Sequence, residues 1–103
     1  MKNSIKEEIA IITEYGAMVA ALKQTWDSRS AKDERAVRIR AHRVAAEVET
    51  ALMDSDDLSR SVTVEFGTVS VSGRHGTEDE AKASLRILKA AAKKVARDMG
   101  LAR

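Results

Sequence analysis

The sequence predicts a helix-dominated α+β fold with the element order α-α-β-β-α. Apolar residues recur at steps of three and four over most of the chain, as on the buried face of a helix. The period falls to two only between residues 61 and 72, as in β-strands. Three hydroxyl residues also stand three positions before a carboxylate, the spacing of a helix capping box, in Ser4 with Glu7, Ser30 with Asp33, and Thr77 with Glu80.

The first predicted helix covers about residues 4–25. Apolar residues repeat there at intervals of seven, at Ile5, Ile12, Val19 and Trp26. Gly16 interrupts the pattern, and a glycine inside a helix costs roughly 1 kcal/mol relative to alanine. Two interpretations of Gly16 stay open: another backbone approaches closely at this point, or the glycine lies on the surface and is tolerated.

The second predicted helix covers about residues 31–53. Its main apolar face follows steps of four and three, at Val37, Ala41, Val44, Val48 and Leu52. A weaker apolar stripe lies on the opposite side, at Ile39, Ala46 and Met53. A helix that is apolar on both sides suggests a surface for self-association, although scattered apolar residues on a surface are also ordinary.

The alternating segment at about residues 61–72 predicts a two-stranded antiparallel hairpin. A two-residue turn at Phe66 and Gly67 places Val64 opposite Val69 and Val62 opposite Val71, with all polar side chains on the other face. A lone hairpin is marginally stable in water, so its valine face should pack on the helices. Its open edges invite pairing with a second copy, and we expect a homodimer.

The third predicted helix covers about residues 78–99, and it carries the most informative charge pattern in the chain. Its apolar stripe is Ala81, Leu85, Leu88, Ala92, Val95 and Met99. Five cations lie together on a neighbouring face, at Lys82, Arg86, Lys89, Lys93 and Arg97. No acid stands among them, so pairing along this helix cannot neutralise the row.

Charge is unevenly distributed over the 103 residues, which we expect to form a single domain, 1–103, without an internal repeat. The net charge is only +2, but residues 29–43 carry six basic and two acidic side chains. Residues 44–58 carry five acids and no base. The chain is therefore strongly polarised, which favours a charged partner.

The inventory of reactive side chains argues against catalysis. The chain has no Cys and only two His, and His42 and His75 share no local spacing. We therefore expect no enzyme activity, no catalytic residues, no cofactor, no metal and no small-molecule substrate. No apolar run is long enough to cross a membrane, and the absence of Cys makes the cytoplasm the expected location.

Two functions remain as hypotheses. In the first, the basic row contacts nucleic acid through its phosphates without reading sequence, or an acidic protein surface, with assistance from Arg35, Arg38 and Arg43. In the second, the chain is a structural or inhibitory interaction module, such as a phage- or plasmid-type accessory protein, which assembles through apolar helix faces. The stripe of Ile39, Ala46 and Met53 distinguishes the second hypothesis.

Overall fold

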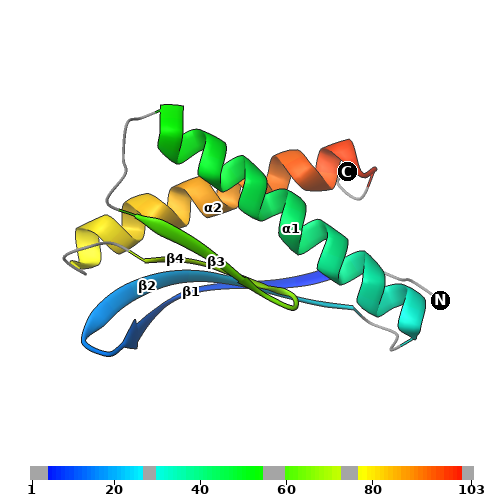
Figure 1. Cartoon of the computed structure of the whole chain (residues 1–103), viewed down its shortest axis with the longest axis horizontal. Coiled ribbons are helices and arrows are strands. Elements are labelled where there is room, and N and C mark those ends of the chain that lie inside the picture. Colours follow the sequence, from blue (N-terminus) through cyan, green and yellow to red (C-terminus); the bar gives the residue numbers. More distant parts are fainter. Residues whose placement is uncertain (1–4, 27–29, 55–59, 73–76, 101–103) are drawn as a thin grey trace.

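The protein is a two-layer structure in which a four-stranded antiparallel sheet is covered on one side by two helices (Figure 1). The computed structural model describes residues 5–26, 30–54, 60–72 and 77–100. The elements follow in the order β1 (Ile5–Glu14), β2 (Ala17–Trp26), α1 (Ala31–Asp54), β3 (Ser61–Glu65), β4 (Thr68–Ser72) and α2 (Glu78–Asp98). The strand order in the sheet is β1-β2-β4-β3.

The predicted order α-α-β-β-α is wrong, because residues 5–26 form a β-hairpin instead of a helix. Tyr15 and Gly16 form the turn between its strands, with φ values of 51° and 81°. Positive φ at both central residues matches the twist of a two-residue hairpin turn and is incompatible with a continuous helix. Gly16 therefore marks neither a close helix contact nor a tolerated helical glycine. Glu7, the expected capping residue, lies within β1.

The elements after residue 30 occur close to where the sequence predicts them. Asp33 and Glu80 donate their backbone N–H groups to the hydroxyls of Ser30 and Thr77, so both helices begin at the expected caps. In the second hairpin, Val64 pairs with Val69 and Val62 pairs with Val71, which is the predicted register. This hairpin does not stand alone, however, because β4 also pairs with β2.

The core lies between the sheet and the helices. Leu22 pairs with Val69 and Ala20 pairs with Val71 across the two central strands, and all four side chains are buried against the helices. The helices contribute buried side chains at Val37, Ala41, Val44, Val48, Leu88, Ala92 and Val95. Most of these side chains are small, which lets the helices approach the sheet and each other closely.

The chain consists of two ββα units related by an approximate twofold arrangement, contrary to the expectation of no internal repeat. In the sheet, the order β1-β2-β4-β3 places the second strand of each hairpin at the centre. The two turns have similar sequences, since Glu14-Tyr15-Gly16 corresponds to Glu65-Phe66-Gly67, and Tyr15 and Phe66 both have positive φ, although Gly16 has positive φ and Gly67 does not. The helix of each unit packs over the hairpin of the other, since α1 lies over β3 and α2 lies over β1.

The helices of the two units also correspond position by position. The buried positions of α1 recur 47 residues later in α2, where Val37, Ala41, Val44 and Val48 match Ser84, Leu88, Ala91 and Val95. Arg40 departs from this pattern, because the corresponding position in α2 is Ile87.

Arg40 connects three elements inside the protein. Its side chain is only 3% exposed, forms an ion pair with Glu7 of β1, and donates a hydrogen bond from Nη2 to the Ala92 carbonyl oxygen of α2 at 3.3 Å. A buried guanidinium without such partners would carry a large desolvation cost. Arg40 therefore ties β1, α1 and α2 together.

We predict that Arg40→Ala lowers the free energy of unfolding by about 3 kcal/mol, because it leaves a cavity and removes both polar contacts of a buried side chain. Chemical denaturation followed by circular dichroism measures the loss. Arg43→Ala, an exposed arginine on the same helix, serves as the matched control and should leave stability nearly unchanged. Equal stability of the two variants would contradict the internal role of Arg40.

We also predict that Gly67→Ala destabilises the protein by about 2 kcal/mol, because the added methyl group overpacks the contact between β2 and the second hairpin. A Cβ atom at Gly67 would lie 2.7 Å from both the Gln24 carbonyl oxygen and Val37 Cγ1. Gly16→Asn is the control, since Gly16 has no atom within 4 Å of its Cβ position and Asn tolerates positive φ. Thermal unfolding compares the two variants, and a Gly67→Ala protein as stable as wild type would disprove this close contact.

Candidate nucleic-acid interface

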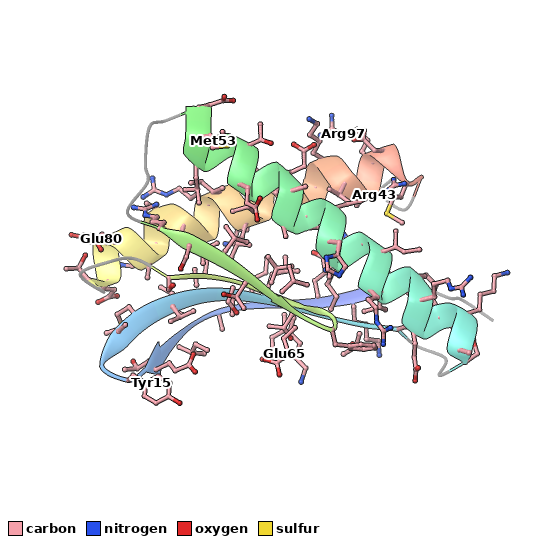
Figure 2. The ribbon with its side chains drawn as sticks, in the orientation of Figure 1. Tyr15, Arg43, Met53, Glu65, Glu80 and Arg97 are labelled. Carbon is pink, nitrogen blue, oxygen red and sulfur yellow. The ribbon has the colours of Figure 1, made fainter. Side chains whose placement is uncertain are left out.

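The five cations of the basic row, Lys82, Arg86, Lys89, Lys93 and Arg97, are all exposed on α2. They lie on the side of the helix away from its buried residues, and Figure 2 shows Arg97 pointing away from the sheet. Lys82 forms one exposed ion pair with Glu78, one turn earlier, at 3.4 Å. Within the described part of the chain, the other four cations have no acidic partner.

The position of α1 relative to α2 leaves the row open. Lys94, which does not belong to the row, pairs across the helix interface with Glu47 of α1 at 3.1 Å. The groove between the helices is lined on the α2 side by Ile87, Ala91 and Lys94, together with Arg86 at its margin. Lys82, Lys89 and Lys93 lie farther round α2, on the flank that faces away from α1. The row is thus not neutralised by the acids of α1.

The structure does not bring Arg35 and Arg38 to the basic row, although both are exposed as predicted. The Arg38 guanidinium lies 5.2 Å from the centre of the Phe66 ring, at the turn between β3 and β4. α1 packs over β3 whereas α2 packs over β1, so these arginines and the row occupy opposite flanks of the helical layer. The expected assistance from Arg35 and Arg38 would therefore require a partner that spans the whole layer.

Arg43 is the only predicted assisting residue that approaches α2. It lines a shallow hollow with Val95 and Asp98, near the C-terminal end of that helix and therefore near Arg97. Arg40, which lies between Arg38 and Arg43 in the sequence, is buried and cannot contact an external partner.

The predicted apolar stripe of α1 is exposed. Ile39 and Met53 are 44% and 70% exposed, Ala46 is also exposed, and Met53 lies on the outer side of the helix (Figure 2). When the two helices are aligned with an offset of 47 residues, Ile39 corresponds to Arg86 and Ala46 corresponds to Lys93. At these two positions the helices differ, with apolar side chains in α1 and cations in α2, whereas Lys82 of the row corresponds to another cation, Arg35.

The two histidines do not form a site in the described structure. His42 is exposed on α1. His75 and its Gly-flanked loop lie outside the described residues. Among residues 5–26, 30–54, 60–72 and 77–100, no three acidic or histidine side chains gather as they would around a metal ion.

A hollow of about 510 Å³ opens beside the end of β2, at the turn between β3 and β4. Its walls include Trp26 and Phe66, and three carboxylates, Asp33, Glu34 and Glu65. Gln24 also contributes to the walls. It is 2% exposed, and its side-chain amide has no hydrogen-bond partner among the described residues. The carboxylates would repel a phosphate, so this hollow does not extend the basic surface.

No family model matches the chain, and neither the curated proteins nor the solved structures contain a match. Of the two described helices, neither combines the length and the apolar character that a membrane span needs.

Sequence reasoning found the basic row but missed the long outer strand β1, since it assigned these residues to a helix. One signal could have found the strand. The triplet Glu14-Tyr15-Gly16 resembles Glu65-Phe66-Gly67, which the sequence correctly identifies as a turn.

Proposed function

We propose that this protein is a small non-enzymatic nucleic-acid-binding protein that contacts phosphates through the basic row of α2, without reading base sequence. The observation that carries the proposal is the absence, among the described residues, of acidic partners for Arg86, Lys89, Lys93 and Arg97. The backbone of α2 is already ordered as a helix, so these exposed cations can contact phosphates without a large loss of backbone entropy on binding.

The dimensions of the row suit a phosphate backbone. From Lys82 to Arg97 the helix rises by about 22 Å, at about 1.5 Å per residue. Long, flexible Lys and Arg side chains over this length can reach several successive phosphates of one duplex. They neutralise charge but do not distinguish base edges, so the proposed binding is independent of sequence.

The opposite side of the protein offers no comparable basic surface. The register of the sheet places Glu8, Glu14 and Glu65 on the face away from the helices, together with Lys6 and Lys23, and Figure 2 shows Glu65 on that side. These side chains carry no excess of positive charge, whereas the basic row does, so we expect a polyanion to contact the helical layer. The proposal places the protein in the cytoplasm, where nucleic acid is accessible and a chain without cysteine needs no oxidising environment.

We predict that wild-type protein binds short duplex DNA with an affinity that falls steeply as salt rises, with a log–log slope of roughly −4 for four to five phosphate contacts. Lys89→Glu with Lys93→Glu should weaken binding at least tenfold at low salt and reduce the slope by about 2. Fluorescence anisotropy over a series of salt concentrations measures both quantities.

The matched control is Lys23→Glu with Lys32→Glu, which changes the net charge equally but lies away from the row. It should retain most of the affinity if local contacts dominate. Equal losses in the two double variants would show that only net charge matters and would contradict the assigned site. No binding of wild-type protein at low salt would disprove nucleic acid as the partner and leave an acidic protein surface as the ligand that the row fits.

A second candidate function is an interaction module that assembles through the outer face of α1. The exposed stripe of Ile39, Ala46 and Met53 favours it, because large apolar side chains exposed on one helix face often mark protein contacts. Under this candidate, Met53→Asp would shift the protein towards monomer in sedimentation equilibrium. An unchanged mass would remove the stripe as an interface between copies.

A further inference from the structure

The outer edge of the sheet at β1 is long and unpaired. β1 pairs with β2 over ten residues, and among the described residues no strand lies on its other side. The opposite edge, β3, has only five residues. A long edge strand presents a row of free backbone donors and acceptors, which readily pair with another strand.

The turn of the first hairpin determines which backbone groups are free. Glu14 and Ala17 flank the two-residue turn, so they form the hydrogen-bonded pair that closes it. Hydrogen-bonded and non-hydrogen-bonded pairs alternate along an antiparallel ladder. The free backbone groups of β1 therefore belong to the odd-numbered residues, including Ile9 and Ile11, whereas Ala10 directs its groups towards β2.

Charge selects one register for pairing β1 with a second copy of itself. Side chains opposite one another must share a face, so odd residues face odd residues and even face even. Two antiparallel copies of β1 are related by a twofold axis. If the axis passes through Ala10, Lys6 lies opposite Glu14 of the partner subunit and Ile9 lies opposite Ile11 of the partner subunit. By symmetry, each of these contacts occurs two times. Centring the axis on Ile9 aligns no opposite charges, and moving it to Glu8 or Ile11 sets carboxylates opposite one another.

We propose that the protein forms a homodimer by antiparallel pairing of β1 with β1 of a second copy, centred on Ala10, to give a continuous eight-stranded sheet. The two ion pairs and two isoleucine pairs arise from one self-complementary strand. Ile12, 45% exposed on the open face, is covered further by the approach of the second strand.

The dimer has a consequence for the proposed function, and only this consequence rests on that proposal. α2 lies over β1 and β2, and Lys82, Lys89 and Lys93 of its basic row lie on the flank away from α1. Pairing at β1 therefore places the two α2 helices on either side of the dyad, with their rows on one surface. Two joined rows double the number of phosphates that one assembly can contact.

A charge exchange tests the register. Lys6→Glu or Glu14→Lys alone sets two pairs of like charges opposite each other, and each variant should raise the dimer dissociation constant at least about tenfold. Combining Lys6→Glu with Glu14→Lys restores opposite charges and should restore wild-type affinity. Sedimentation equilibrium without nucleic acid measures all four proteins, so its outcome is independent of whether the row binds DNA.

Two controls make the result specific. Lys23→Glu, on the neighbouring strand, should leave the dissociation constant unchanged, as should Met53→Asp. A monomeric wild-type protein, or a double variant no better than the single ones, would overturn the proposal. Dissociation caused by Met53→Asp but not by Lys6→Glu would overturn it in favour of the α1 stripe.

A cysteine on the symmetry axis tests the same register independently of charge. Because the chain has no cysteine, Ala10→Cys introduces a single thiol, and the two copies of residue 10 face each other as a non-hydrogen-bonded pair. Mild oxidation should give a disulfide-linked dimer on a non-reducing gel. Thr63→Cys, on β3, should remain largely uncrosslinked, and equal crosslinking of both variants would contradict the assigned interface.

Discussion

Antiparallel pairing of β2 with β4 is the interaction on which the rest of the structure depends. Each hairpin alone would be marginally stable in water, and this pairing joins them into one sheet with a continuous apolar face. It also sets the two ββα units in an approximate twofold relation, so that each helix covers the hairpin of the other unit. Neither unit can bury its own apolar surface alone, which explains why the core is shared between them.

The near-symmetry makes the differences between the units informative. The equivalent outer faces of the helices carry Ile39 and Ala46 in α1 but Arg86 and Lys93 in α2. Inside the protein, Arg40 of α1 replaces the apolar side chain that α2 has at Ile87, and it connects α1 with both β1 and α2. Two similar frameworks thus differ on their outer faces, where α1 exposes the apolar side chains of Ile39 and Met53 and α2 exposes the basic row.

The error at residues 4–25 has a physical origin. Apolar residues at intervals of seven fit two turns of a helix, and alanines in this segment favour helix locally. In the structure, β2 is a central strand flanked by β1 and β4, and pairing on both sides outweighs the local preference of Ala20 and Ala21. Small side chains are suitable there because the helices pack closely on this strand. The basic row was predictable because it depends only on helical periodicity and on the buried face of the same helix.

The sequence by itself determined both helices, the second hairpin with its register, and the exposed cations of α2, because capping residues and apolar periodicity act over a few neighbouring positions. Only the tertiary structure decided that the first segment is a hairpin, that Arg40 is internal, that Arg35 and Arg38 lie apart from the basic row, and that β1 is an open edge. Each of these features depends on contacts between segments that lie far apart in the sequence. Contacts of that kind are selected by the packing of the whole core, which no local pattern of residues specifies.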